Sequence, residues 1–334
     1  MKDKLKIIFM GTPEFAGIIL EKLIASETYK PSLVITRPDK PLGRKQILTP
    51  PPVKQRITNK IKVLQPERLK DPEIITKIKE EEPDIIIVAA YGKIIPKEIL
   101  DIPRFGILNV HASLLPLYRG ASPISAAILN ADRKTGATIM LIDEELDHGP
   151  ILSQTRVSIT PEDTTESLGQ KMANAGADLL INIVPKWIDG AIKPQTQDHS
   201  RATYAKIIAK QDGEIKTEHT AEHIERMARA YYPWPGIYLN YESPKESKLP
   251  TGQVRIMNYE SEKKRLKIIK IKVVKCEKNL PPLSLSLTFK KELCLHTANG
   301  CLILETVQPE SKKSMSGYDF YLGNKSLTPH SSMI

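Results

Sequence analysis

Short apolar runs alternate with helix-length segments through the first part of the chain. The runs have the length of strands and carry few polar residues, which is typical of strands buried on both faces of a parallel sheet. They cover residues 5–10, 33–36, 84–90, 106–110, 137–142 and 151–159. The helical segments cover residues 13–26, 67–82, 123–130 and 163–188. This alternation predicts an α/β domain with a doubly wound, mostly parallel sheet, whose ligands bind at the carboxyl ends of the strands.

The pattern changes after Pro194, where the chain becomes polar and then rich in strand-like pieces. A short helical segment over 221–230 leads into the sequence Tyr-Tyr-Pro-Trp-Pro-Gly. Beyond it, strand-like runs cover residues 237–240, 253–259, 266–275, 284–290 and 301–307. Their fairly regular spacing, with turn residues between them, predicts a small β-barrel or sandwich. We therefore expect a first domain over 1–194, a linker over 195–210 and a C-terminal domain over 211–334.

Length and composition agree with two globular domains. The 334 residues are 40% hydrophobic and 26% charged, which excludes collagen-like, mucin-like and wholly disordered proteins. No apolar run approaches the roughly 18 residues of a membrane span, and the N-terminus lacks the apolar core of a signal peptide. Cys276, Cys294 and Cys301 are odd in number and lack metal-ligand spacing. We therefore expect no disulfide framework, no metal and a reducing cytoplasm.

Positive charge is concentrated in the C-terminal part of the chain. The net charge is +10, and residues 201–334 hold 22 Lys and Arg against 14 Asp and Glu. A second basic cluster over residues 37–62 contains eight Lys or Arg and one acidic residue, Asp39. Within it, the prolines and the glycine of residues 38–45 predict a long, mobile loop. Both regions favour a polyanionic partner, because neutralised phosphates release counterions, although a solvated basic surface explains the same composition.

Polar side chains at the ends of two predicted strands are the clearest chemical signal. Asn109 and His111 lie two residues apart on one strand, so their side chains leave the same face. Asp147 follows the strand predicted over 137–142. An amide donor beside an imidazole can stabilise an oxyanion and move a proton, while a carboxylate can fix the tautomer of the imidazole. A structural histidine and a solvated carboxylate are the alternatives at this point.

Two other kinds of chemistry are disfavoured. Gly11 is followed by Thr12 and Pro13, and the chain lacks the GxGxxG fingerprint there, so a nicotinamide dehydrogenase is not expected. Neither a serine nor a cysteine has an evident activating base in the sequence, so a covalent intermediate on the protein is not expected either.

The sequence around these polar residues resembles the formyltetrahydrofolate-dependent formyltransferases. The resemblance rests on His111-Ala112-Ser113-Leu114-Leu115-Pro116, on Arg119-Gly120 and on Leu146-Asp147-His148-Gly149. His148 stands where this family often has a small residue. Further matches extend along nearly the whole chain, at residues 10–16, 43–44, 50–54, 90–96, 233–236 and 322–323. The basic loop and the C-terminal domain single out the branch of the family that acts on methionyl-initiator tRNA.

The resemblance implies a formyltransferase-like Rossmann-type domain followed by an OB-like barrel. The amine of methionyl-initiator tRNA would attack the formyl carbon of 10-formyltetrahydrofolate directly. Asn109 would donate to the developing oxyanion, and His111 would stabilise it and help to shuttle a proton. Asp147 would orient His111. The folate would lie against Ser113, Leu114, Leu115, Pro116, Ala89, Ala90, Tyr91 and Gly92.

The same resemblance assigns the tRNA to the basic regions. Arg44 is the best single contact to the acceptor stem, because the planar guanidinium suits phosphates and base edges. The predicted tRNA-binding residues are Lys40, Arg44, Lys45, Lys206 and Lys210, with Lys263, Lys264 and Arg265 as further candidates. We expect Tyr231, Tyr232 and Trp234 to pack at the domain junction rather than to stack on bases. We also expect a cytoplasmic monomer that binds no membrane.

Three other functions stay open on the sequence. A formyltransferase acting on an amino-sugar nucleotide or on glycinamide ribonucleotide shares the central motifs but needs neither basic region. A non-catalytic RNA-binding protein is not expected to retain Asn109, His111 and Asp147 together. A formyltetrahydrofolate hydrolase would use water in place of the amine, and an amine-dependent rate would exclude it.

Overall fold

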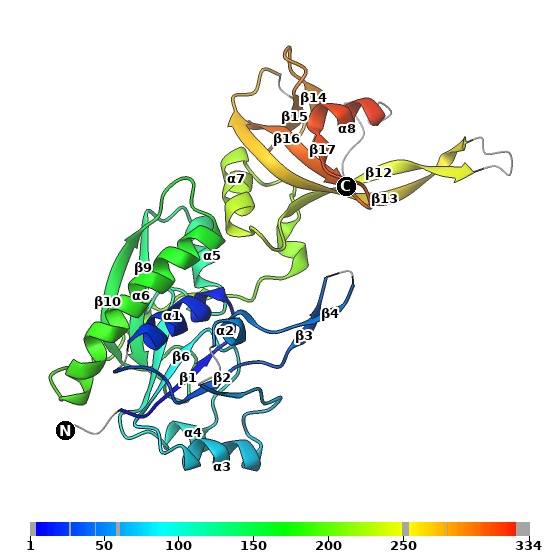
Figure 1. The fold of residues 1–334 in the computed structure, drawn as a ribbon. Helices are drawn as coiled ribbons and strands as arrows, with labels where there is room; N and C mark the ends of the chain where they lie inside the picture. Colours follow the sequence, from blue (N-terminus) through cyan, green and yellow to red (C-terminus); the bar gives the residue numbers. More distant parts are fainter. Residues whose placement is uncertain are drawn as a thin grey trace. The chain divides into compact units, whose positions relative to one another are not determined.

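The computed structural model in Figure 1 describes residues 5–26, 28–43, 45–57, 61–248, 254–278 and 280–324. Side chains are described outside residues 243–262. Arg44, the residue predicted to contact the acceptor stem, lies outside the described residues. The chain divides into two compact units between Ile207 and Ile208, a point within the segment that we expect to be the linker.

A seven-stranded sheet with the order β10-β9-β7-β6-β1-β2-β5 forms the centre of the first unit. Its parallel strands are β1 (Ile7–Gly11), β2 (Leu33–Ile35), β5 (Lys62–Leu64), β6 (Ile85–Ala89) and β7 (Ile107–His111). β9 (Lys134–Leu141) runs antiparallel to β7, and β10 (Ile151–Ser158) runs antiparallel to β9. From β1 the chain proceeds to β2 and β5 on one side and returns to β6 and β7 on the other. The predicted doubly wound, mostly parallel sheet is therefore confirmed.

Helices cover both faces of this sheet, as Figure 1 shows. α1 (Glu14–Ala25) and α6 (Thr165–Ile188) pack on one face, while α3 (Pro72–Glu80) and α4 (Lys97–Leu100) pack on the other. In β1, Ile7 and Phe9 join the first apolar cluster and Ile8 and Met10 join the second. Burial on both faces explains why the strands are apolar at every position. None of the described helices combines the length and the apolar character that crossing a bilayer requires.

The segment predicted to be a loop over residues 38–45 contains the first strand of a β-hairpin, so the expectation of an irregular loop is wrong. β3 (Lys40–Leu42) pairs antiparallel with β4 (Ile47–Thr49), and α2 (Pro52–Gln55) follows them. Asp39 at the base of the hairpin accepts hydrogen bonds from Lys54 Nζ at 2.8 Å and from Gln65 Nε2 at 2.7 Å. These contacts tie the hairpin to its own unit, and they were not predictable from its basic, proline-containing sequence.

The second unit is an antiparallel, β-rich domain. α7 (Ala221–Ala230) precedes a sheet in the order β12-β13-β16-β15-β14, with β17 (Met315–Ser316) beside β16 and α8 (Gly317–Gly323) after it. The strands are β12 (Ile237–Lys248), β13 (Val254–Val274), β14 (Leu285–Leu287), β15 (Leu293–His296) and β16 (Cys301–Pro309). The runs predicted over 253–259 and 266–275 belong to the single long strand β13. Register shifts between Ile268 and Ile271 mark bulges in that strand, and bulges bend strands as a small curved sheet requires.

A disulfide joins Cys276 to Cys301 in the second unit, so the expectation of no disulfide is wrong. Val274, at the end of β13, is paired with Cys301, at the start of β16. Cys276 follows two residues after Val274, and its Cα atom lies 5.2 Å from that of Cys301. The two cysteines are 25 residues apart, and only the register of the two strands brings them together. Cys294 is free and buried.

Candidate active site

The structure brings Asn109, His111 and Asp147 together at the carboxyl end of β7. Asn109 and His111 occupy alternate positions near the end of that strand, while Asp147 lies in the loop between β9 and β10. Asn109 Nδ2 donates to Asp147 Oδ1 over 3.4 Å, and His111 Nδ1 lies 3.6 Å from the same oxygen. The carboxylate therefore faces both the amide and the imidazole. The predicted trio forms one cluster on the edge of the sheet where α/β ligands bind.

The backbone around His111 selects one tautomer of its ring. His111 Nε2 lies 3.0 Å from the carbonyl oxygen of Tyr118. A carbonyl can only accept, so Nε2 carries the proton and Nδ1 presents its lone pair in the neutral ring. Nδ1 is the nitrogen on the side of Asp147. The ring is thus arranged to accept a proton at Nδ1 while a carboxylate lies next to the positive charge that forms.

The carboxylate of Asp147 is held in place by a hydrogen bond from a neighbouring strand and by an unusual backbone conformation of the residue itself. Gly120 N donates to Asp147 Oδ2 over 2.7 Å, so one carboxylate oxygen is held while the other faces the trio. Asp147 has a φ of 49°, in the left-handed region that non-glycine residues rarely adopt. Ala90 and Tyr118, in two other loops at this edge, also have positive φ values. Such conformations gather at functional sites, where the surrounding structure must hold them.

Gln197 is the main supporting residue that the sequence analysis missed. Its Nε2 donates to the carbonyl oxygens of Asp147 and Gly149 over 2.9 and 2.7 Å. Its Oε1 accepts from Arg119 Nη2 at 2.7 Å and from Arg119 Nε at 3.2 Å. Both Gln197 and Arg119 are buried. Gln197 thereby links the Asp147 loop to the strand that supplies the Gly120 amide, and no local sequence signal marks it.

The segment that carries Gln197 is part of the first unit and pairs with a strand near the trio. β11 (Tyr204–Ala205) pairs parallel with β8 (Arg119–Gly120). His199 accepts from Arg119 Nη2 over 2.9 Å at Nδ1 and stacks on His148 with ring centroids 4.0 Å apart. His148 in turn pairs with Asp143 at 2.7 Å. His148, at a position where this family often has a small residue, therefore packs beside the Asp147 loop, and its ring contacts Asp143 and His199.

The predicted folate segment Ser113–Pro116 lies next to the trio in sequence and is held in place by hydrogen bonds. Ser113 is fully buried, and its hydroxyl donates to the carbonyl oxygen of Leu117 over 2.6 Å. Thr138 Oγ1, from β9, donates to Ser113 O and accepts from Leu115 N. Gln154, from β10, donates to Leu115 O over 2.9 Å. The Ser113 side chain is thus bonded inside the protein, and the surface that this segment offers to a ligand includes the partly exposed Leu114 and Pro116.

The other predicted folate segment, Ala89–Gly92, follows β6 at the same edge. Ala89 and Tyr91 are buried, whereas Ala90 and Gly92 are exposed. Arg37 Nη2, which follows β2, donates to Gly92 O over 2.7 Å. Burial raises the pKa of Tyr91 to about 12. Thr36 Oγ1, Arg37 Nε and the Tyr91 hydroxyl are buried without a hydrogen-bond partner, and such polar atoms fit an edge that holds a polar ligand or its water.

The predicted tRNA-binding lysines lie in three places. Lys40 is exposed on β3, and Lys45 is exposed in the turn of the same hairpin. Lys206 follows β11 in the first unit, and Lys210 begins a short 3₁₀ helix, Lys210–Gly213, in the second unit. Tyr231 is buried, while Tyr232 and Trp234 are exposed, so packing of these two rings at the junction stays a prediction.

Both parts of the chain match a known family. Residues 4–184 match the family described as formyl transferase, and residues 207–325 match the formyl transferase C-terminal domain. The first match alone covers more than half of the chain. The chain therefore belongs to the formyl transferase family.

Within that family, the chain is similar to proteins named methionyl-tRNA formyltransferase. The one from Roseiflexus castenholzii is 39% identical over 320 residues, which cover 96% of each chain. Among solved structures, WlaRD, a sugar 3N-formyl transferase in the presence of dTDP and 5-N-formyl-THF, has a TM-score of 0.60 at 19% identity. The match covers 93% of this chain and 99% of WlaRD. Aquifex aeolicus HypX in complex with tetrahydrofolic acid has a TM-score of 0.58 at 15% identity, with 96% of this chain spanning 47% of HypX.

Proposed function

We propose that this chain transfers the formyl group of 10-formyltetrahydrofolate to the α-amino group of methionyl-initiator tRNA. The observation that carries the proposal is the Asn109–His111–Asp147 cluster, in a chain that is similar over 96% of its length to a methionyl-tRNA formyltransferase. The product is N-formylmethionyl-tRNA for the start of translation. The enzyme acts as a monomer in the cytoplasm.

The proton transfers follow from the tautomer of His111. The neutral amine attacks the formyl carbon, and His111 Nδ1 accepts a proton from the nitrogen as the tetrahedral intermediate forms. The imidazolium that results is stabilised by Asp147, 3.6 Å away. The proton then passes to N10 of the folate as the bond between N10 and the formyl carbon breaks. The reaction thus needs neither a covalent enzyme intermediate nor an external proton source.

Asn109 supplies the second element of catalysis. Its amide has two N–H groups, of which one points toward Asp147. The other donates to the oxygen of the formyl group as negative charge develops there. A preorganised donor of this kind lowers the activation free energy by about 2.7–4 kcal/mol.

The two substrates use separate surfaces in this proposal. The folate lies along Ser113–Pro116 and Ala89–Gly92, where rigid backbone and buried polar atoms line the edge of the sheet. Two solved structures of the same fold, HypX and WlaRD, are described with tetrahydrofolic acid and with 5-N-formyl-THF, which supports this choice of co-substrate. The tRNA contacts Lys40 and Lys45 of the β3–β4 hairpin, together with Arg44, which lies between them in sequence, and it contacts the basic C-terminal unit.

A panel of formyl acceptors tests the proposal. The purified protein is supplied with 10-formyltetrahydrofolate and with methionylated initiator tRNA, uncharged tRNA, free methionine, an amino-sugar nucleotide or glycinamide ribonucleotide. We expect transfer to the charged tRNA alone. Transfer to a small amine would assign the chain to another branch of the family, and formate release without any amine would make it a hydrolase.

A further inference from the structure

Three potential metal ligands meet in the C-terminal unit, apart from the candidate active site. They are Cys276, just after β13, His296, at the end of β15, and Cys301, at the start of β16. Their donor atoms all lie within 4.8 Å of one another. In the part of the chain that the structure describes, no other group of three His, Cys, Asp or Glu donors comes this close.

The strand register makes this cluster a property of the fold. His296 on β15 is paired with Cys301 on β16, and residues paired across an antiparallel sheet point to the same face. Val274 is paired with Cys301 from the other side, which places Cys276 next to the same position. His296 and Cys301 are buried, whereas Cys276 is exposed. His296 and Cys301 are therefore fixed on strands inside the sheet, and solvent reaches the cluster at Cys276.

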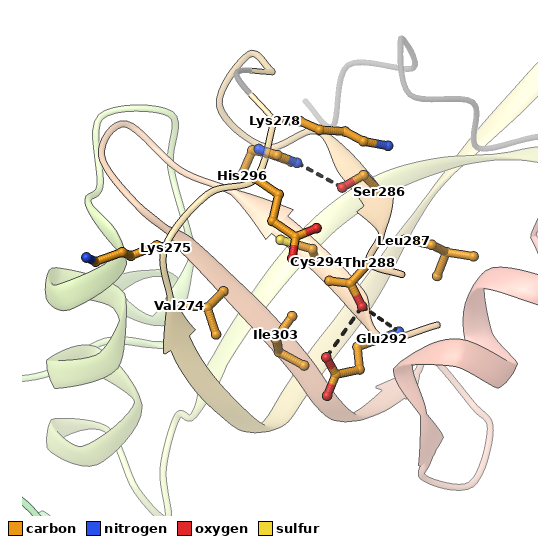
Figure 2. A pocket seen from close by; sticks show the side chains of 11 residues that line it. Val274, Lys275, Lys278, Ser286, Leu287, Thr288, Glu292, Cys294, His296 and Ile303 are labelled. Carbon is orange, nitrogen blue, oxygen red and sulfur yellow. Dashed lines mark hydrogen bonds between the residues drawn. The ribbon is translucent and has the colours of Figure 1, made fainter. Parts of the chain in front are cut away.

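The imidazole of His296 is oriented as a metal ligand would be. Its Nδ1 lies 3.3 Å from Cys301 Sγ, and its Nε2 lies 2.9 Å from the hydroxyl of the buried Ser286. Figure 2 shows the hydrogen bond between His296 and Ser286 across the sheet. A ligating histidine usually donates its second ring N–H to such a partner, which fixes the tautomer and leaves the other nitrogen free for the metal.

The oxidation state decides what these groups can do. In the structure, Cys276 and Cys301 form a disulfide. If the protein works in the cytoplasm, as the proposed function requires, a dithiol reductant such as thioredoxin keeps such pairs reduced. The reductant supplies two electrons and two protons, becomes a disulfide itself, and leaves two thiols beside one imidazole. This step of the inference rests on the proposed function.

We propose that the reduced Cys276–Cys301 pair and His296 bind a zinc ion. Zn²⁺ would be held by the two sulfurs and by His296 Nδ1, and the two thiols would lose their protons to solvent as the bonds form. The soft thiolates select zinc over the hard cations magnesium and calcium. The two thiolate charges balance the charge of Zn²⁺, so the metal would add no net charge to this part of the sheet. Because Cys276 is exposed, water would occupy the fourth coordination position of the metal.

Zinc binding would join the ends of three strands without the disulfide. β13, β15 and β16 form the middle of the sheet of the C-terminal unit. The metal therefore stabilises that unit in a reducing compartment, and oxidation of the two cysteines releases it.

Zinc titration of the full-length protein tests the proposal. The protein is reduced, freed of reductant and metal without air, and titrated with Zn²⁺ against a chromophoric chelator. We expect about one tightly bound zinc per chain, and Co²⁺ in its place should show sulfur-to-cobalt charge-transfer absorption. Cys276→Ser, at an exposed position, should lose the tight binding and the absorption. Cys294→Ser is the matched control, because Cys294 lies two residues from His296 on β15 but outside the donor set, and it should keep both.

Ser286→Ala tests whether the hydrogen bond to His296 supports zinc binding. Loss of the hydrogen bond to His296 Nε2 should weaken zinc binding by about 10- to 100-fold while the charge-transfer band stays. A fully reduced wild-type protein that binds no zinc, or binds it as well after Cys276→Ser, would overturn the proposal. Formyl transfer is assayed on the same samples. If the protein transfers the formyl group but binds no zinc, the zinc proposal is wrong and the proposed function is unaffected.

Discussion

The candidate active site and the β3–β4 hairpin are built in opposite ways. At the site, buried side chains from segments far apart in sequence hold one another, as Gln197 holds the Asp147 loop and Arg119. The hairpin is held at its base by Asp39, and it exposes Leu42, Ile47 and Leu48 by 58, 61 and 65%. Preorganised, buried groups suit chemistry at one atom. An exposed apolar and basic surface suits a large partner that covers it. The difference indicates that turnover and tRNA binding can be changed separately.

His111→Ala should have the largest effect. Without the Nδ1 base, proton transfer from the amine fails, and we expect kcat/KM to fall by roughly 10²–10⁴-fold. Transfer to methionylated tRNA measures the loss. His223→Ala, on α7 of the second unit, is the matched control, because it removes an imidazole that lies outside the trio and its supporting loop. A comparable loss in both variants would contradict the role assigned to His111.

Asp147→Asn should come next. The asparagine is nearly isosteric but cannot balance the imidazolium, so we expect kcat to fall by about 10²-fold with folate affinity unchanged. Turnover and folate binding are measured on the same preparation, the second by fluorescence titration. Loss of folate binding in proportion to turnover would mean that Asp147 acts on the folate rather than on His111.

Gln197→Ala should lower kcat by roughly 10-fold or more, because small displacements of catalytic groups are costly. Its two donated hydrogen bonds fix the loop of Asp147, so the KM for tRNA should change little. The melting temperature should fall moderately, because the buried Arg119 loses its partner. Steady-state kinetics and thermal unfolding separate these effects. Gln170→Ala, at an exposed position of α6, serves as the control. A fall in melting temperature that accounts for the lost activity would make Gln197 a purely structural residue.

Lys40→Ala and Lys45→Ala should have the smallest effects, limited to tRNA binding. We expect a higher KM for charged tRNA, an unchanged kcat, and a salt dependence reduced by about one phosphate contact per lysine. The same result is expected for Arg44→Ala. Lys79→Ala on α3 is the control, since it removes an exposed lysine from a helix far from the hairpin in sequence. Equal changes in the KM for tRNA in all four variants would mean that the hairpin acts only through the overall positive charge of the protein.

The sequence was sufficient to predict the parallel core and the meeting of Asn109, His111 and Asp147 at one edge of the sheet, for physical reasons. Burial on both faces leaves a run of apolar residues in each strand, as in β1 and β6, and that pattern is visible locally. Asn109 and His111 belong to one strand, and a family motif marks Asp147.

The features that were missed depend on contacts between distant residues. Gln197 acts through Arg119, 78 residues away, and its own surroundings in sequence look like a polar linker. The Cys276–Cys301 pair depends on the register of β13 and β16. The β3–β4 hairpin depends on the clamp at Asp39, whose partner Gln65 lies 26 residues further along the chain. Local patterns carry no information on such pairings.

The most direct test of the separation between chemistry and binding is the salt dependence of formyl transfer by the wild-type protein. kcat and the KM for methionylated initiator tRNA are measured from low to high salt at saturating 10-formyltetrahydrofolate. We predict that KM rises steeply, because tRNA phosphates contact exposed lysines, while kcat stays nearly constant, because His111 and Asp147 are shielded from solvent. A kcat that falls in parallel with tRNA affinity would contradict the account.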